Sequence, residues 1–245
     1  MFKSSGVTTL TQADRACIAR NKAKALQLQR FRSLGAAPLA TRGFKALYGK
    51  SGEKKFFDIN TGTIQVNTTG SFNLMFIPVL GSDYNNRIGR KTRAVSFYIR
   101  GRCQTEQAGT VGSTTIVAQQ ARLIVFIDLQ PNGAAPSVTD LLNEALPSSQ
   151  LNANNRDRFM ILKDKIYYFG PYTKDVGFAA FENTGYNIKI YKKINMETIY
   201  NSTNGGTIAD LSSGALYMFW IGSQTASGGG DANAIVSTRV RFIDY

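Results

Sequence analysis

Alternating polar and apolar residues dominate the chain from Lys55 onward, and clusters of Gly, Asn and Ser interrupt the alternation. Runs of this kind, rich in Val, Ile, Phe, Tyr and Thr, predict half-buried β-strands. The predicted strands are 57–66, 71–80, 93–103, 114–129, 158–169, 186–196, 215–223 and 234–243. Because little helix separates them, the pattern excludes a doubly wound α/β fold and favours an all-β antiparallel sandwich or jelly roll.

Two of these strands carry more detail. The apolar run 123–127 predicts a strand that is buried on both faces. The alternation in 93–103 predicts that Phe97 and Ile99 share one face with Arg93 and Val95, while the other face carries Ala94, Ser96, Tyr98, Arg100 and Arg102. One helix is predicted between the strands, at 137–146, with Ser137 as its N-cap and Asp140 completing a capping box.

The amino-acid composition excludes several classes of function. The chain has 245 residues, 43% of them hydrophobic, which suffices for one sizeable core or two small ones. It contains no His, and this excludes Ser-His-Asp and Cys-His catalysis and every zinc site that needs imidazole. Its two cysteines, Cys17 and Cys103, are too few for a four-thiolate metal site. No pair of acids stands out on one strand face, so we do not expect an enzyme of the two-carboxylate type either.

The positive charge of the chain is concentrated at its N-terminus. The net charge is +13, and residues 1–55 hold twelve Lys or Arg against two acids. We therefore expect two parts. The first is a basic arm over residues 1–54, helical at about 12–32 with a linker to 54, and the second is a jelly-roll β domain over 55–245. A cationic arm on a nearly neutral body indicates a polyanionic partner such as nucleic acid or an anionic membrane surface. Two alternatives remain open for the arm: a solvated tail without a partner, and a cleavable targeting peptide.

The candidate nucleic-acid ligands fall in both parts. In the arm they are Lys3, Arg15, Arg20, Lys22, Lys24, Arg30, Arg32, Arg42, Lys45 and Lys50. In the β domain they are Arg90, Arg100 and Arg102, whose even numbering predicts one shared strand face. Solvated arginines, or arginines paired with carboxylates at an interface, are the alternative for these three. Tyr98 on the same face is a candidate for stacking on an unpaired base, with simple interface area as its alternative.

Four segments in register resemble one viral family. They are GSDYNNRIGRK at 81–91, IRG at 99–101, LIVFID at 123–128 followed by PSVTDLL at 136–142, and DRFMILKD at 157–164. In order and spacing they are similar to the capsid proteins of small icosahedral single-stranded viruses, of the satellite tobacco necrosis virus type and of circular single-stranded DNA viruses.

The resemblance implies a single eight-stranded jelly roll and a function. Sixty copies would form a T=1 icosahedral shell, and the basic arm would face inward and bind a single-stranded genome, with DNA favoured. The expected location is the virion, assembled inside the host cell with the nucleus as one option, and no membrane span is expected. No host receptor is indicated.

Two further points stay open on sequence grounds. No cofactor is expected, and calcium at subunit junctions is an alternative without assigned residues, because Asp83, Asp128, Asp210, Asp231 and Asp244 show no compact ligand spacing. The alternative function is a cellular jelly-roll module that binds nucleic acid or glycan without forming particles. A glycan binder would expose aromatic platforms, whereas Trp220 lies in an apolar strand and is predicted to belong to the core.

Overall fold

The computed structural model describes residues 54–105, 114–116, 118–170, 172–174, 185–201, 206–225 and 232–244, together with Gln12 and Asn21, both of which are helical. The chain divides into two compact units, Met1–Ser51 and Gly52–Tyr245. The predictions for the arm lie outside the described residues apart from Gln12 and Asn21. The second unit contains all of the described strands.

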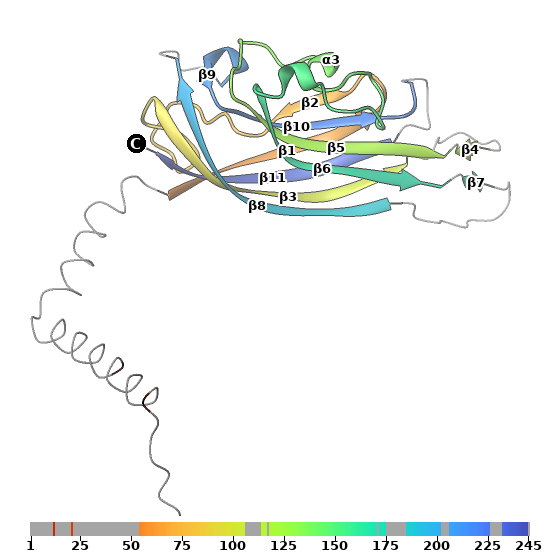
Figure 1. Ribbon diagram of the computed structural model, residues 1–245, viewed down its shortest axis with the longest axis horizontal. Coiled ribbons are helices and arrows are strands. Elements are labelled where there is room, and N and C mark those ends of the chain that lie inside the picture. The colour runs from red at the N-terminus through yellow and green to blue at the C-terminus, as the bar shows by residue number, and fades with distance from the viewer. Residues whose placement is uncertain are drawn as a thin grey trace, which may run out of the picture. The chain divides into compact units, whose positions relative to one another are not determined.

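Two antiparallel sheets form this unit (Figure 1). The first sheet has the order β1–β11–β3–β8–β9, with bounds Lys54–Val66, Ala232–Asp244, Lys91–Thr105, Gly185–Tyr200 and Leu211–Ser213. The second sheet has the order β2–β10–β5–β6, with bounds Ser71–Leu74, Ala215–Gly222, Gln119–Asp128 and Phe159–Phe169. A small separate pair joins β4 (Thr114–Ile116) to β7 (Tyr172–Lys174).

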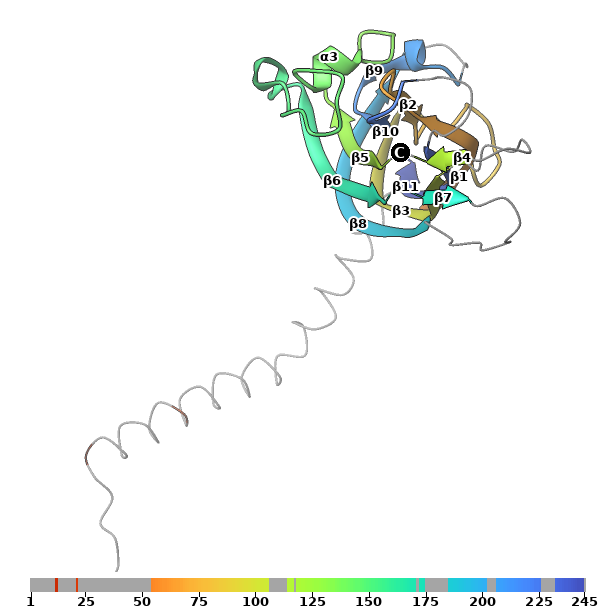
Figure 2. The ribbon, with the colours of Figure 1, turned by 90° about the vertical axis from the view of Figure 1, so that its right-hand side faces the viewer.

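The strand order identifies the fold. When the three-residue strands β4, β7 and β9 are set aside, eight strands remain among the described residues. The first pairs with the last, the second with the seventh, the third with the sixth and the fourth with the fifth. This is one long antiparallel ribbon folded over on itself, the topology of a jelly roll, so the predicted fold is confirmed. Figure 2 looks along the strands and shows the two sheets curling around a shared interior.

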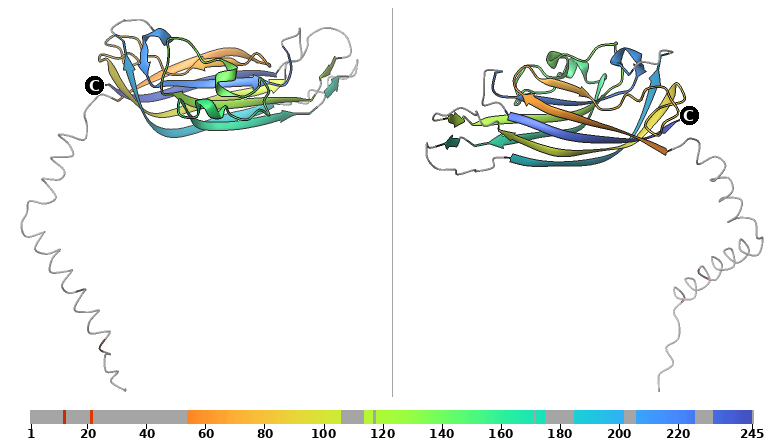
Figure 3. Two further views of the ribbon diagram at one scale, coloured as in Figure 1. Left: turned by 45° about the horizontal axis from the view of Figure 1, so that its top comes forward. Right: turned by 180° about the vertical axis from the view of Figure 1, so that it is seen from behind.

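The two central strands of the second sheet, β5 and β10, are buried on both of their faces. On β5, Leu123 and Val125 point into the core between the sheets, whereas Ile124 and Phe126 point to the other side. There they pack in one cluster with Val138 and Leu141 of the short helix α3 (Val138–Leu141). Figure 3 shows this helix over the outer side of the second sheet. The prediction of a doubly buried strand at 123–127 is confirmed. Trp220 on β10 is fully buried in the core between the sheets, as predicted.

A β-bulge corrects the predicted faces of β3. The register of β3 shifts between Ala94 and Ser96 against β8, and at the same place against β11. Because the bulge adds one residue, Ala94 is buried on the same side as Phe97 and Ile99 rather than opposite to them. Val95 is exposed.

The other differences concern lengths. Helix α3 has the predicted capping box, in which the backbone N–H of Asp140 bonds the Ser137 hydroxyl and the backbone N–H of Ser137 donates to the Asp140 carboxylate. The helix ends at Leu141, after one turn, because the chain turns extended at Leu142 and pairs there with Leu151. The predicted strand 71–80 ends at Leu74, and the predicted strand 114–129 divides into β4 and β5. Two 3-10 turns, Ala153–Asn155 and Ile208–Asp210, complete the described elements.

Candidate nucleic-acid interface

The outer face of the first sheet gathers basic side chains from β3, β8 and β11. These strands are paired in register, so residues opposite one another point to the same side. Arg100 on β3 stands opposite Lys189 on β8, and Arg102 follows in the next outward position. Toward the other end of the strands, Arg241 on β11 and Lys193 on β8 are both paired with the same residue of β3.

Five exposed cations, Arg100, Arg102, Lys189, Lys193 and Arg241, together make up what we call the basic face. None of them forms an ion pair with another described residue. The outward positions of β1, β3, β8 and β11 carry two carboxylates, and both are already paired: Asp58 with Arg239, and Glu197 with Lys91. The surface therefore presents uncompensated positive charge, the property needed to attract phosphates.

Aromatic rings lie among these charges. Between the two groups of cations, Tyr98 on β3 stands directly opposite Tyr191 on β8. Tyr191 is 56% exposed, and Tyr98 is half-buried. On the β1 side of the face, the rings of Phe56 and Tyr84 lie 5.3 Å apart, and the Arg239 guanidinium lies 5.0 Å from the centre of the Phe56 ring. Basic and aromatic side chains mixed on an open sheet suit single-stranded nucleic acid.

Three of the carboxylates that were candidates for calcium, Asp128, Asp210 and Asp244, have other partners within the chain. Asp128 is fully buried and accepts two hydrogen bonds from the guanidinium of Arg158, at 3.0 and 2.8 Å. Asp210 caps its own 3-10 turn by accepting from Thr207. No group of three or more acidic or cysteine side chains gathers within the described part of the chain, which does not include Asp231. We assign calcium to no residue.

Asp244, the last residue of β11, connects this strand to the start of β1 and to the loop before β3. Its carboxylate accepts from the backbone N–H groups of Ile88 and Gly89, at 2.6 and 3.3 Å, and from the ammonium group of Lys55 at 3.4 Å. Lys55 also donates to the backbone oxygen of Asn86. In sequence Lys55 belongs to the basic N-terminal residues, but its charge is buried in β1 and paired, so it is not available to a polyanion.

Among the described residues, the ionisable groups with a shifted pKa do not suit acid–base chemistry at neutral pH. Burial raises the pKa of the Cys103 thiol to about 12, and burial also raises the pKa of Tyr167 to about 12. The backbone N–H of Ser137 lowers the pKa of Asp140. Each shift moves the group away from pH 7, where a general acid or base should titrate.

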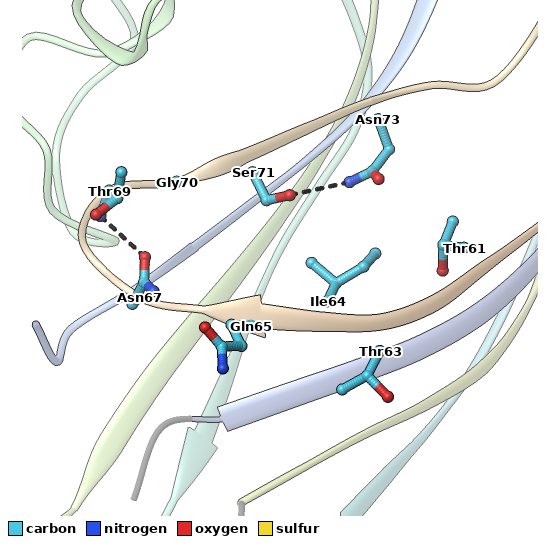
Figure 4. A pocket seen from close by; sticks show the side chains of 9 residues that line it. All are labelled: Thr61, Thr63, Ile64, Gln65, Asn67, Thr69, Gly70, Ser71 and Asn73. Atoms are coloured by element: carbon cyan, nitrogen blue, oxygen red, sulfur yellow. Dashed lines mark hydrogen bonds between the residues drawn. The ribbon is translucent and has the colours of Figure 1, made fainter. Parts of the chain in front are cut away.

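A hollow of about 530 Å³ lies between β1 and β2 (Figure 4). Hydroxyl and amide side chains dominate its lining, and no acidic or basic side chain takes part. Two hydrogen bonds order this wall: the N–H of Thr69 donates to the Asn67 side-chain oxygen, and the Asn73 amide donates to the Ser71 hydroxyl. The hollow offers polar contacts but no group for proton transfer.

Comparison with known proteins identifies the family of this chain. The model of the Geminivirus coat protein/nuclear export factor BR1 family matches residues 38–245. The chain belongs to this family.

Viral shell proteins are also among its relatives. The capsid protein of Satellite tobacco necrosis virus 1 is 34% identical over 113 residues, which make up 45% of this chain and 53% of the relative. The coat protein of Maize white line mosaic satellite virus is 30% identical over 125 residues, 50% of this chain and 55% of the relative. The matches thus span about half the length of these curated relatives. The resemblance to capsid proteins of small single-stranded viruses is confirmed.

Among solved structures, the match to desmodium yellow mottle tymovirus has a TM-score of 0.33 and 9% identity, and it covers 78% of this chain and 85% of the other. The jelly roll assigned to this member of the coat protein/BR1 family rests on its own strand order instead. No helix within the described ranges is long and apolar enough to cross a membrane.

In this coat-family chain the predicted ligands separate into three groups. The ten arm residues lie outside the described part of the chain. Arg100 and Arg102 lie on the basic face with Tyr98, as their shared strand face predicted. Arg90 does not belong to β3, which begins at Lys91, and the bulge at Val95 breaks the even numbering that linked it to the other two. Its backbone oxygen accepts from the N–H of Tyr200 at the edge of the sheet.

Sequence reasoning missed three members of the basic face: Lys189, Lys193 and Arg241. Their own strands were predicted, but nothing in the pattern of one strand says which strands are its neighbours. A jelly-roll pairing scheme applied to the predicted strands would have found them, because that scheme places β3 between β11 and β8.

Proposed function

We propose that this chain is a viral coat protein whose copies assemble into a closed shell around a single-stranded nucleic-acid genome. Membership of the coat protein family is the observation that carries the proposal. The family match favours it over a cellular jelly-roll module for nucleic acid or glycan. The role is structural: copies of the β domain build the wall, and positive charge holds the cargo.

The basic arm supports the packaging part of the proposal. Residues 1–54 hold eleven basic side chains and two acids, a net charge of +9 before the shell domain contributes. Binding to phosphates releases the counterions that surround a nucleic acid, and this provides affinity without any reading of sequence. Sixty arms would bring on the order of 500 positive charges into one shell, enough to neutralise part of a short genome.

The basic face supports the same role from the wall. Its five cations lie on one sheet, with Asp58 and Glu197 already engaged by other partners. We propose that this face lines the inside of the shell and continues the arm's contacts with the genome. We also propose that the shell is a T=1 particle of 60 copies, that its genome is DNA, and that it assembles inside the host cell. Imaging of infected cells would tell assembly in the nucleus from assembly in the cytoplasm.

Two sets of charge-removing substitutions test this division. In one variant of the full chain the ten candidate ligands of the arm become Gln; in the other the five residues of the basic face become Gln. Both variants are expressed beside the wild type, particles are examined by electron microscopy, and nuclease-protected nucleic acid is measured per particle, with DNase and RNase used separately.

We expect particles from all three proteins, with the largest loss of protected nucleic acid in the arm variant and a smaller loss in the face variant. Cargo of the wild type should be released more readily at high salt, because salt screens phosphate contacts. If the arm variant protects as much nucleic acid as the wild type, the packaging role of the arm is wrong. If the wild type forms no particles, the coat function itself is wrong.

A further inference from the structure

We propose that Tyr98 and Tyr191 form a stacking platform for unpaired bases at the centre of the basic face, so that this face binds single strands in preference to duplexes. The proposal rests on the proposed packaging function and deepens it. It specifies which form of nucleic acid the wall contacts and which side chains make the distinction.

The two tyrosines lie side by side on the exposed face of the first sheet. Tyr98 and Tyr191 are register partners on neighbouring strands, so their side chains stand side by side on the outer face of the sheet. Facing residues of paired strands lie about 5 Å apart, which gives a two-ring surface of the size of one or two bases. Tyr191 is 56% exposed, although it lies in the middle of a sixteen-residue strand. In Figure 2 no described segment covers this side of the first sheet.

The other aromatic residues of this face are already occupied. Phe56 packs against Tyr84 on one side and against the guanidinium of Arg239 on the other. Arg239 is in turn held by both oxygens of Asp58, at 2.8 and 2.6 Å. This group therefore satisfies itself within the subunit. Tyr98 and Tyr191 lie next to it on the sheet but outside it, and their rings remain available to a ligand.

Charge on both sides of the pair selects the ligand. Arg100 and Lys189 occupy the next outward positions in one direction along the strands, about 7 Å away at two residues per step. Arg241 and Lys193 occupy the corresponding positions in the other direction. Single-stranded nucleic acid fits this arrangement, because its bases can lie on the tyrosine rings while its phosphates reach the cations on either side.

The pairing state of the nucleic acid then decides the affinity. In a duplex the faces of the bases are stacked on one another, so the cations can bind its phosphates but the two rings gain nothing. In a single strand the bases are free to stack on the rings. The tyrosines should therefore add affinity for the single strand only, while the cations contact phosphates in both forms.

The test measures binding of the full-length chain, since the arm then contributes the same charge attraction in every variant. The probes are a labelled thymidine 20-mer, an abasic strand of the same length that carries phosphates without bases, and a mixed-sequence duplex of 20 base pairs. The variants are Tyr98→Leu, Tyr191→Leu, both together, and the two Tyr→Phe changes that keep the ring. Tyr168→Leu is the matched control, because Tyr168 is 61% exposed but lies on β6 in the second sheet.

We expect each Leu variant to bind the thymidine strand about fivefold more weakly than the wild type, and the double variant about thirtyfold more weakly, as stacking on one ring per base predicts. Binding of the abasic strand and of the duplex should change less than twofold. The Phe variants and Tyr168→Leu should bind all three probes like the wild type. The salt dependence of binding should be unchanged in every variant, because no phosphate contact is removed.

Several results would overturn the inference. Equal losses on the thymidine strand, the abasic strand and the duplex would mean that the substitutions disturb charge or folding rather than stacking. No loss on any probe would mean that the rings do not touch the nucleic acid. Loss of particles with unchanged binding would place the tyrosines at a contact between subunits. A wild type that binds none of the probes would instead overturn the packaging function itself.

Discussion

Replacement of Asp244 by Ala should destabilise the shell domain more than any exposed charge change. The carboxylate lies at the end of β11 and holds Lys55 at the start of β1, together with the N–H groups of Ile88 and Gly89. The side chains of Lys55 and Asp244 are 1% and 6% exposed. Removal of the carboxylate takes the charged partner from a buried ammonium group and an acceptor from two partly buried N–H groups, a loss of about 3–5 kcal/mol. That is a large part of the roughly 5–15 kcal/mol that stabilises a typical domain.

The ion pair of Asp58 and Arg239 provides the control. Its geometry is better than that of the buried pair, with two hydrogen bonds of 2.8 and 2.6 Å, but its side chains are 44% and 49% exposed. Water and salt screen such a pair, so Asp58→Ala should cost about 1 kcal/mol or less. Equilibrium unfolding in urea, at a protein concentration where the subunit is not assembled, measures both variants.

A double-mutant cycle with Lys55→Met separates the ion pair from the backbone contacts of Asp244. The coupling between Lys55 and Asp244 should exceed about 1 kcal/mol, since the two groups share one buried site. If Asp58→Ala costs as much as Asp244→Ala, burial is not what makes the interaction of Asp244 strong.

Individual residues give three further predictions. The lowered pKa of Asp140 means that the capping box contributes fully above the unfolded value of about 3.9 and is lost as pH falls through the folded value, so Asp140→Asn should flatten the acid limb of a stability–pH curve. In a Cys17→Ser chain, Cys103 should resist alkylation by iodoacetamide at pH 8 until urea unfolds the protein, because burial raises its pKa to about 12; rapid labelling of the folded chain would contradict this. Gly101→Ala should cost about 1–3 kcal/mol or more in urea unfolding, since a Cβ there would collide with the backbone oxygen of Ile235, whereas Gly170→Ala has open space and should be nearly neutral.

The sequence predicted those features of the β domain that depend on the residues of a single strand. The apolar run 123–127 and the alternation in 186–196 state directly how many faces are buried, and the structure agrees with both. The Ser137–Asp140 capping box was also visible, because its two residues need a fixed spacing of three. These features depend on neighbours within a few positions of the chain.

Features that depend on another strand were not readable. The bulge at Val95 carries no glycine or other local signal, and it reversed the predicted face of Ala94. The basic face likewise combines residues about 90 and 140 positions apart, from Arg100 to Lys189 and to Arg241, and only strand pairing brings them together. The buried role of Lys55 could not be seen either, since its partner Asp244 lies at the other end of the chain.

The mass of the assembled particle decides whether copies of this chain build a closed shell. We expect native mass spectrometry of particles from the full chain to give about 1.6 MDa of protein, the mass of 60 copies of 26.8 kDa, plus a nuclease-resistant nucleic acid. Cargo that resists nuclease while enclosed and is digested after the particle is opened would complete the agreement. Finding only single subunits or small oligomers, with no protected nucleic acid, would contradict the account.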